Sequence, residues 1–262
     1  MSVLGILGVG ELADKLVRGL RRSGYTGAIL LSSRNAECAA QLEGDCGCRI
    51  MDSNQAVVDG ADTVIVGVRP GTLDELAAQV SFREGQHLVS LLAGISLEQL
   101  SAAFPGASCV RVMLSYGALF NQSTIVICPP DPRAEELLKP LGQLVVVEDE
   151  SSFELATVAA CMNGWFYFLL HDLQQWLSEK GLSAQDARTL VLGNLQDCIA
   201  RAHYHPEQSL SELGQSIATP GTFTYAGLEV LMHQPVSASW GAACEVVLDA
   251  LLTRSKLEAQ KP

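Results

Sequence analysis

A glycine motif near the start of this 262-residue chain constrains its fold more than any other feature. Gly8, Gly10 and Ala13 form the pattern G-x-G-x-x-A between the apolar segment Val3–Leu7 and the helix-periodic segment Glu11–Arg22. In such a strand–turn–helix, the first glycine permits a tight turn, the second lets the backbone approach a pyrophosphate, and the small third residue lets helix and strand pack closely. The free amides of the helix N-terminus then face the phosphates. The pattern predicts a dinucleotide-binding turn, with a purely structural glycine turn as the alternative.

The first 150 residues alternate strand-like and helix-like segments. Further strands are predicted at Ala28–Ser32, Thr63–Val68, His87–Leu92, Cys109–Met113, Thr124–Cys128 and Leu144–Val147. A polar helix is predicted near Ala36–Leu42, and capping boxes at Thr72/Glu75 and Ser96/Gln99 predict the start of two more. Strands interleaved with helices indicate βαβ units and a mostly parallel sheet.

After Glu148 the helical period takes over. An apolar stripe from Leu155 to Leu177, with aromatic residues around it, indicates a long helix buried on several sides. Ser183 with Asp186 restarts a helix to about Tyr204, and helices follow at about 208–217, 221–232 and 237–257. We predict a Rossmann-type dinucleotide-binding domain over residues 1–150 and an all-helical domain over residues 151–262.

The end of the second strand bears on the choice of cofactor. An acidic residue there would bind the ribose 2′-hydroxyl of NAD, whereas this chain has Ser32-Ser33-Arg34-Asn35. With no carboxylate in this stretch, the planar fork of Arg34 favours the 2′-phosphate of NADP, and a solvent-facing arginine is the alternative. Glu11, in the first helical turn, would repel a pyrophosphate if it pointed inward, and the sequence leaves its orientation open.

Composition limits the partners. The net charge of −12 argues against nucleic acid. Eight scattered cysteines and the absence of an N-terminal signal pattern favour a reducing cytoplasm. The pair Cys46 and Cys48 lacks the second Cys/His pair of a zinc site, so no metal is predicted. No uninterrupted apolar run approaches the roughly 20 residues that span a bilayer, so no membrane is predicted either.

Five segments, in order, resemble motifs of the pyrroline-5-carboxylate reductase family over nearly the whole chain. The glycine loop GVGELA opens the series, and the others follow. They are Val68-Arg69-Pro70 for V-K-P; Ser90–Ser96 for S-x-x-A-G-I-[ST]; Arg111 and Met113 of R-x-M-P-N; and Thr219–Leu231 for S-P-G-G-T-T followed by A-G-L-E-x-L.

The resemblance implies roles for individual residues. NADPH would be bound by Gly8, Val9, Gly10, Glu11, Leu12, Ala13, Ser33, Arg34, Val68, Arg69, Pro70, Ala93 and Met113. The imine substrate would be bound by Ser115, Thr219, Gly221 and Thr222. The hydroxyl of Thr224 would be the catalytic donor to the imine nitrogen, with helix capping as the alternative. We expect the site in the cleft between the two halves, at the carboxyl ends of the parallel strands.

Three segments depart from the family pattern. Met113-Leu114-Ser115 replaces M-P-N, Ala160–Trp165 replaces G-S-G-P-A-Y, and Thr222 with Phe223 replaces G-T. All three fall where the resemblance places the nicotinamide and the substrate, and buried polar groups discriminate strongly between analogues. The sequence therefore predicts an NADPH-dependent reductase of a cyclic imine or a related small C=N substrate. An authentic pyrroline-5-carboxylate reductase and an inactive NADP-binding homologue are the alternatives.

The helical half also has more apolar helix surface than a small bundle needs, and large exposed apolar patches mark interfaces. The resemblance implies interlocked helical domains in a two-fold dimer. We predict a homodimer through the helical domain, with higher oligomers as an extension.

Overall fold

The computed structural model describes residues 2–259; Met1 and residues 260–262, at the outer ends of the two predicted domains, lie outside the described residues. The chain divides into two compact units. Unit 1 holds the chain up to Ala160 and again from Leu248 on, and unit 2 is Cys161–Val247. A long helix begins at Glu150, where the strand pattern was expected to stop. The predicted domain boundary between residues 150 and 151 stays a prediction.

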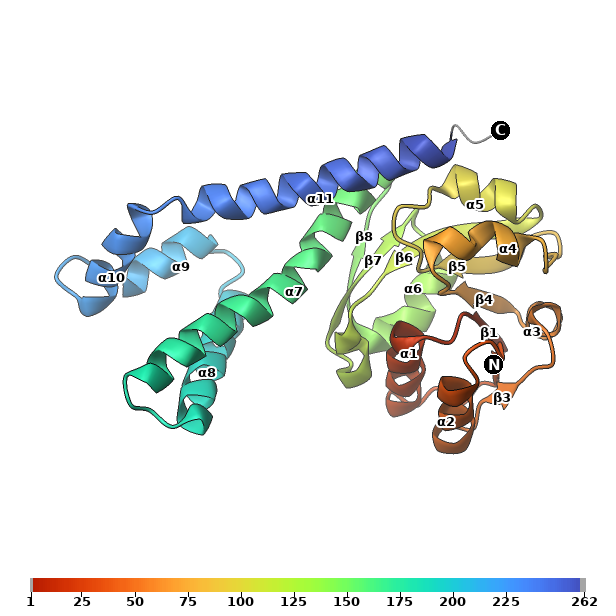
Figure 1. The fold of residues 1–262 in the computed structure, drawn as a ribbon, viewed down its shortest axis with the longest axis horizontal. Helices are drawn as coiled ribbons and strands as arrows, with labels where there is room; N and C mark the ends of the chain where they lie inside the picture. The colour runs from red at the N-terminus through yellow and green to blue at the C-terminus, as the bar shows by residue number, and fades with distance from the viewer. Residues whose placement is uncertain (1, 260–262) are drawn as a thin grey trace. The chain divides into compact units, whose positions relative to one another are not determined.

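Unit 1 is built on an eight-stranded sheet in the order β3-β2-β1-β4-β5-β6-β7-β8 (Figure 1). The strands are β1 (Leu4–Leu7), β2 (Ile29–Leu31), β3 (Arg49–Ile50), β4 (Thr63–Val66), β5 (Gln86–Ser90), β6 (Ala107–Met113), β7 (Ser123–Cys128) and β8 (Gly142–Val146). All neighbouring strands are parallel except β6 and β7. The predicted α/β fold with a mostly parallel sheet is confirmed. Strand order reverses between β1 and β4, which is where open α/β sheets bind ligands.

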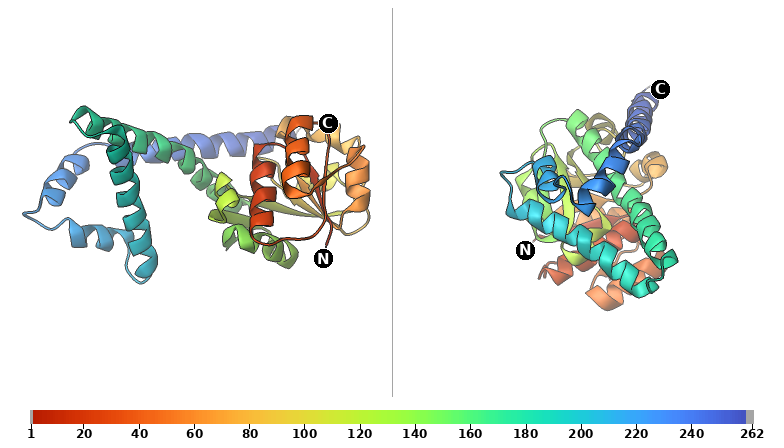
Figure 2. Two further views of the ribbon diagram at one scale, coloured as in Figure 1. Left: turned by 90° about the horizontal axis from the view of Figure 1, so that it is seen from below. Right: turned by 90° about the vertical axis from the view of Figure 1, so that its left-hand side faces the viewer.

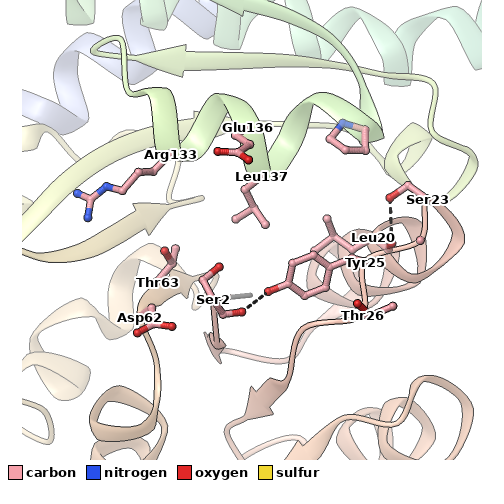
Figure 3. Close-up of a pocket in the computed structure, with 12 residues that line it drawn as sticks. Ser2, Leu20, Ser23, Tyr25, Thr26, Asp62, Thr63, Arg133, Glu136 and Leu137 are labelled. Carbon is pink, nitrogen blue, oxygen red and sulfur yellow. Dashed lines mark hydrogen bonds between the residues drawn. The ribbon is translucent and has the colours of Figure 1, made fainter.

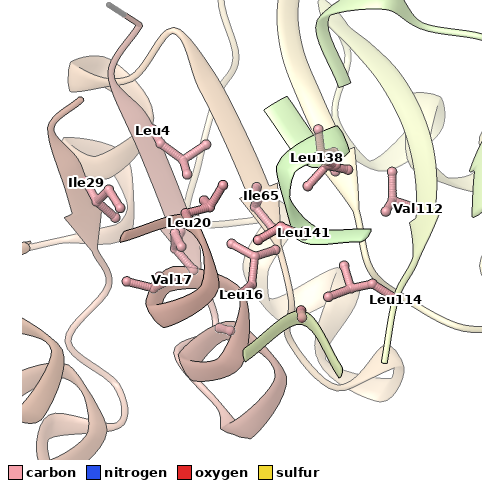
Figure 4. Close-up of a cluster of buried hydrophobic side chains, with 14 of the residues drawn as sticks. Leu4, Leu16, Val17, Leu20, Ile29, Ile65, Val112, Leu114, Leu138 and Leu141 are labelled. Carbon is pink, nitrogen blue, oxygen red and sulfur yellow. The ribbon is translucent and has the colours of Figure 1, made fainter. Parts of the chain in front are cut away.

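Helices cover both faces of this sheet. They are α1 (Glu11–Arg22), α2 (Ala36–Cys46), α3 (Asn54–Gly60), α4 (Leu73–Ala77), α5 (Leu97–Ala103) and α6 (Pro132–Leu138), with 3₁₀ turns η1 (Pro70–Thr72), η2 (Tyr116–Phe120) and η3 (Lys139–Leu141). Leu16 and Leu20 of α1 pack with Leu138 of α6 in one apolar cluster (Figure 4). Helices α3, α4 and α5 supply a second cluster. Strand β1 gives Leu4 to the first cluster and Leu7 to the second, so it is buried on both faces, as its apolar sequence predicts.

The two predicted capping boxes have different outcomes. Ser96 and Gln99 form theirs at the start of α5, with distances of 3.2 Å and 2.7 Å between the paired atoms. The box predicted for Thr72 and Glu75 is wrong. The Thr72 hydroxyl donates to the carbonyl of Arg69 at 2.8 Å, because the residues before α4 close into η1 and use the hydroxyl there.

Unit 2 is helical in every element that the structure assigns (Figure 2). It contains most of α7 (Glu150–Glu179), then α8 (Ala184–Tyr204), α9 (Leu210–Ile217), α10 (Phe223–Met232) and the first half of α11 (Val236–Ala259). Ser183 caps α8 by accepting the amide of Asp186, as predicted. The all-helical C-terminal region is confirmed.

The long helix α7 is less covered than its sequence predicts. Trp165 and Phe166 pack on the ring of Trp240 from α11, with centroids 6.0 Å and 5.6 Å away. Tyr167 and Phe168 remain 71% and 73% exposed. The expectation of a helix buried on several sides is therefore wrong within one chain, because no described residues of the same chain cover these rings.

Two helices have the length and mean hydropathy of a membrane span: Glu150–Glu179 and Val236–Thr253. The expectation that nothing in the chain approaches such a span was based on uninterrupted apolar runs, whereas polar residues interrupt both helices. The test is weak, because apolar interface and core helices pass it as well.

Candidate functional site

The glycine turn has the geometry that a dinucleotide requires. Gly8 has a φ of +90°, and a Cβ there would lie 2.6 Å from the Val68 nitrogen, so no other residue fits without moving backbone. Gly10 precedes α1 with open space where a Cβ would stand, and no side chain caps the helix. The first amides of a 12-residue helix therefore face an open space next to a turn that only glycine can make.

Neighbouring side chains hold the turn in place. The Gly8 amide donates to the Ser32 hydroxyl at 3.0 Å, and the Asn35 amide group donates to the Val9 carbonyl at 3.0 Å. Ser32 directly follows β2, and Asn35 is the N-cap of α2. The turn is thus tied to the strand end where the adenosine ribose was expected.

The orientation of Glu11 is resolved. Its side chain is 72% exposed and lies along α1, with its carboxylate 3.2 Å from the Lys15 ammonium. This lysine also pairs with Asp14 at 2.9 Å, and hydrogen bonds to Asp14 and then Glu11 raise its pKa. Glu11 therefore has a cation one turn along the helix, away from the space over Gly10.

A hollow of about 380 Å³ lies at the carboxyl ends of β1 to β4. It brings together four of the predicted cofactor residues: Gly8, Ser33, Arg34 and Val68. Arg34 is 67% exposed, and its Nη1 lies 3.4 Å from Oε2 of Glu75.

The same hollow corrects one expectation. The stretch Ser32–Asn35 lacks a carboxylate, which led us to expect none near the 2′ position, yet Asp52 and Glu75 both line the hollow. Asp52 follows β3, and Glu75 lies on α4. Both are distant from Arg34 in sequence, and the fold of the chain brings all three residues to the same hollow.

A smaller, apolar hollow of about 40 Å³ lies where β5 and β6 end. It brings together the predicted cofactor residues Leu12, Ala93 and Met113. Sequence analysis missed two further lining residues, Phe153 and Thr157, which come from the first turns of α7. The Thr157 hydroxyl donates to the Phe153 carbonyl at 3.0 Å, so it presents its methyl group and oxygen lone pairs rather than a free donor.

A buried arginine fixes those first turns of α7. Arg111 on β6 places Nη1 2.8 Å from Glu150 and Nη2 2.7 Å from Glu154, and its guanidinium lies 4.3 Å from the centre of the Phe153 ring. Glu150 also accepts the amide of Leu97 at 2.8 Å. The retained arginine of the R-x-M motif, together with Glu150, therefore links β6, the first residue of α5 and the start of α7, and so positions the walls of the apolar hollow.

The remaining unit 1 candidates are engaged locally. Arg69 and Pro70 belong to the turn that leads into η1, and the Arg69 carbonyl accepts both the amide and the hydroxyl of Thr72. The Ser115 hydroxyl accepts the Gly117 amide at 3.2 Å and lies 3.3 Å from the Ser123 hydroxyl. A substrate role for Ser115 stays a prediction. Over residues 2–259, the structure contains no group of three or more His, Cys, Asp or Glu arranged to hold a metal ion.

The four candidates of unit 2 lie together before and at the start of α10. Pro220 and Gly221 form a tight turn in which the Thr222 amide donates to the Thr219 carbonyl at 3.1 Å, and Gly221 has a φ of +88°. Thr222 caps α10 by accepting the Tyr225 amide at 3.1 Å. The capping alternative for Thr224 is therefore wrong, because Thr222 already provides the cap.

A hollow of about 530 Å³ lies at the amino ends of the strands, opposite the carboxyl ends that carry the glycine turn (Figure 3). Ser2 and Thr63, at the amino ends of β1 and β4, line it with Arg133 and Glu136 of α6. Open α/β sheets bind their ligands outside the carboxyl ends of the strands. The candidate site is thus the edge that carries the glycine turn.

Two known families match this chain. Residues 3–94 match the family described as NADP oxidoreductase, coenzyme F420-dependent. Residues 150–251 match the pyrroline-5-carboxylate reductase dimerisation family. The two matches fall on the glycine-motif region and on the helical region that the sequence analysis separated.

Individual proteins match over nearly the full length. The chain is 26% identical to the pyrroline-5-carboxylate reductase of Haemophilus influenzae, over 97% of both chains. The structure of 1-pyrroline-5-carboxylate reductase from Streptococcus pyogenes is similar with a TM-score of 0.84 and 21% identity, covering 95% of this chain and 98% of that one.

Two other solved structures share the fold. Plasmodium falciparum pyrroline carboxylate reductase with NADP bound has a TM-score of 0.83 at 16% identity, covering 97% of this chain and 98% of that one. An imine reductase from Pseudomonas sp. has a TM-score of 0.61 at 15% identity, covering 98% and 94%.

Proposed function

This chain is a divergent member of the pyrroline-5-carboxylate reductase family, and from that premise we propose that it is an NADPH-dependent reductase of a cyclic imine. At the coarser level it is an oxidoreductase of the kind that uses a nicotinamide dinucleotide and acts on a C=N bond. The observation that carries the proposal is the glycine turn, open over Gly10 and adjacent to an uncapped α1.

The residues of unit 1 would hold the cofactor in two parts. The amides at the start of α1 would receive the pyrophosphate, and Ser33 with Arg34 would receive the adenosine ribose and its 2′-phosphate. The apolar hollow near Ala93 and Met113 would lie against the nicotinamide. The relative from Plasmodium falciparum, crystallised with NADP, supports the choice of NADP.

When bound, the reduced cofactor would supply the hydride that reduces the imine carbon. The chain must keep the substrate against that face and provide a proton or hydrogen bond to the nitrogen. We assign the hydrogen bond to the Thr224 hydroxyl, which capping leaves free. Thr219, Gly221 and Thr222 would bind the polar group of the substrate at the turn before α10.

The substrate class follows from what has changed around the site. Leu114 stands where the family has proline, and Met162 stands in α7 where the family has glycine. Larger apolar side chains make the surroundings of the site less polar and favour a cyclic imine that is less polar than pyrroline-5-carboxylate. Proline formation itself is the second candidate, since the similarity to the Haemophilus influenzae enzyme spans 97% of both chains.

A binding measurement followed by a substrate panel tests the proposal. Nicotinamide fluorescence should report saturable binding of NADPH to the full-length protein, and NADPH oxidation should then be followed with five- and six-membered cyclic imines, with and without a carboxylate. Turnover of a six-membered or uncarboxylated imine above that of pyrroline-5-carboxylate supports the proposal. Faster turnover of pyrroline-5-carboxylate supports the second candidate, and cofactor binding without turnover of any imine would indicate an inactive homologue.

We also propose that the protein acts as a homodimer in the cytoplasm. All eight cysteines lie in the described part of the chain and all are free thiols, which suits a reducing compartment. The match of residues 150–251 to a dimerisation family supports assembly through the helical region.

A further inference from the structure

The hollow at the carboxyl ends of β1 to β4 contains opposing charges. Arg34 is the only cationic side chain among the described residues that line it, and Asp52 and Glu75 supply two carboxylates. Glu75 lies closest to the cation, with Oε2 3.4 Å from Nη1 of Arg34. A ligand that binds Arg34 therefore meets Glu75 as well.

Glu75 is held near Arg34 by the packing of its own helix. Leu73 and Leu76 of α4 are buried in the apolar cluster that α3, α4 and α5 form against the sheet. Their burial fixes which side of α4 faces outward. The capping interaction that the sequence predicts for Glu75 does not form, because the Thr72 hydroxyl is bonded to Arg69. The Glu75 carboxylate therefore makes no capping hydrogen bond and can pair with Arg34.

The pair is weak enough to be rearranged by a ligand. Arg34 is 67% exposed and Glu75 is 55% exposed, so water screens their attraction. A 2′-phosphate could take the guanidinium at little cost, but its charge would then stand within a few ångströms of the Glu75 carboxylate. A free 2′-hydroxyl carries no charge and meets no such repulsion.

We propose that Glu75 is a cofactor-selectivity residue, which opposes the 2′-phosphate of NADPH by competing for Arg34 and by like-charge repulsion. The inference rests on the proposed function, since it assumes that this hollow receives the adenosine ribose. Arg34 attracts the phosphate, Glu75 offsets part of that attraction, and the chain discriminates less strongly between NADPH and NADH than Arg34 alone would make it.

The test compares dissociation constants for NADPH and NADH, measured by titration calorimetry on the full-length protein and four variants. Glu75→Gln keeps the shape of the side chain and removes its charge. Asp74→Asn is the matched control, because it removes the same charge from the same turn of α4 but does not line the hollow. Arg34→Ala removes the cation, and the double variant Arg34→Ala, Glu75→Gln separates competition from repulsion. Thermal melting checks that every variant is folded.

Glu75→Gln should tighten NADPH binding by about fivefold and change NADH binding by less than about twofold, the range for an exposed charge pair. Asp74→Asn should change both by less than about twofold. Arg34→Ala should weaken the binding of NADPH and leave that of NADH nearly unchanged. When Arg34 is already replaced by Ala, Glu75→Gln should increase NADPH affinity by less than it does in the unaltered protein. The advantage of Glu75→Gln should also shrink as salt is raised.

Equal effects of Glu75→Gln on both dinucleotides, weaker NADPH binding, or a change no larger than that of Asp74→Asn would each overturn the inference. Weaker NADH binding alone would do so too, since Glu75 would then be a ribose ligand. The proposed function fails differently: the unaltered protein would bind neither dinucleotide, and this inference would fail with it.

Discussion

Gly8 and Gly10 stand two residues apart in one turn, yet the fold requires glycine only at Gly8. At Gly8 the backbone itself demands it, with a φ of +90° and Val68 in the way of a Cβ. At Gly10 the backbone is extended, with a φ of −109°, and the space for a Cβ is open. A Cβ at residue 10 would therefore clash only with a bound ligand.

Gly10→Ala should therefore leave the fold intact and weaken dinucleotide binding. The free energy of unfolding should change by less than about 0.5 kcal/mol, as for an unstrained surface substitution, while NADPH and NADH both bind at least about tenfold more weakly. Gly8→Ala is the contrasting variant and should cost more than about 2 kcal/mol of stability, because it adds positive-φ strain to a backbone clash. Urea unfolding and NADPH titration measure both effects. Unchanged NADPH binding in Gly10→Ala would remove the glycine turn from the site.

Thr222 and Thr224 allow a similar separation of stability from catalysis. Thr222 caps α10, whereas Thr224 is exposed in the first turn of that helix. Thr224→Ala should lower turnover on the best imine by about 100-fold, the smaller end of proton-donor effects, with the melting temperature and NADPH affinity unchanged. Thr224→Ser should restore most of the rate. Thr222→Ala should lose about 1 kcal/mol of stability with its cap, in addition to the substrate contact proposed for Thr222. A Thr224→Ala protein with full turnover would exclude the assigned donor role.

Sequence reasoning selected the candidate residues whose signal is local. Gly8, Gly10 and Arg34 each stand at a defined place in one βα or strand-end segment, so the strand–turn–helix context identifies them. Glu75, Phe153 and Thr157 lie on helices remote from that segment. The sequence assigned Glu75 only to a capping box and gave Phe153 and Thr157 no motif. Long-range packing alone brings them to the site, and a pattern of neighbours along the chain does not contain that information.

At the scale of whole elements, the long and strongly patterned segments were the predictable ones. Helix α1 was predicted at Glu11–Arg22 and is observed there, since its apolar spacing and the preceding glycines agree. Strand β3, at Arg49–Ile50, was missed because two residues carry no periodicity. The three long helices of the C-terminal region, α7, α8 and α11, were placed along the chain. The burial of α7 was not predicted, since burial depends on what lies opposite an apolar face.

One buried contact between elements predicts a pH dependence of stability. His87 on β5 is fully buried, with Nδ1 3.1 Å from the Thr63 hydroxyl on β4 and Nε2 3.2 Å from Asp131, which caps α6. Burial lowers the pKa of His87 below its ordinary 6.5, Arg133 adds to that effect, and Asp131 offsets it in part. The neutral ring is therefore favoured in the folded protein more than in the unfolded chain.

The sign follows from proton uptake. As pH falls below about 6.5 the unfolded chain takes up a proton at His87 before the folded protein does, so stability is present above that pH and is lost toward the lowered pKa. Between about pH 6.5 and 5.5 this residue should contribute a loss of at most about 1.4 kcal/mol. Urea unfolding of the unaltered protein and of His87→Gln at several pH values measures it. The variant should show a shallower decline on the acid side, and equal slopes would contradict the assignment.

At the scale of the whole molecule, many large apolar side chains remain exposed in a single chain. Within one chain, α7 exposes the rings of Tyr167, Phe168 and Trp176, and α10 exposes Val230, Leu231 and Met232. Val246 of α11 is 69% exposed. At roughly 25 cal/mol per Å² of apolar area, leaving such faces in water forfeits several kcal/mol, and exposed patches of this size mark interfaces.

A second copy of the chain is the occupant that the dimerisation-family match over residues 150–251 supports. We therefore expect an obligate homodimer that buries over roughly 2,000 Å² of mostly apolar surface. Light scattering at micromolar concentration should give twice the chain mass of 27.9 kDa, or a higher even multiple. Val246→Glu places a charge at an exposed apolar position of α11 and should shift the protein toward monomers with reduced turnover, whereas Val246→Leu should leave the oligomeric state and the turnover unchanged. NADPH binding should survive in the monomer, because the glycine turn and Arg34 belong wholly to unit 1. A single species of 27.9 kDa for the unaltered protein would refute the dimer, and loss of NADPH binding on dissociation would show that the cofactor site needs the partner.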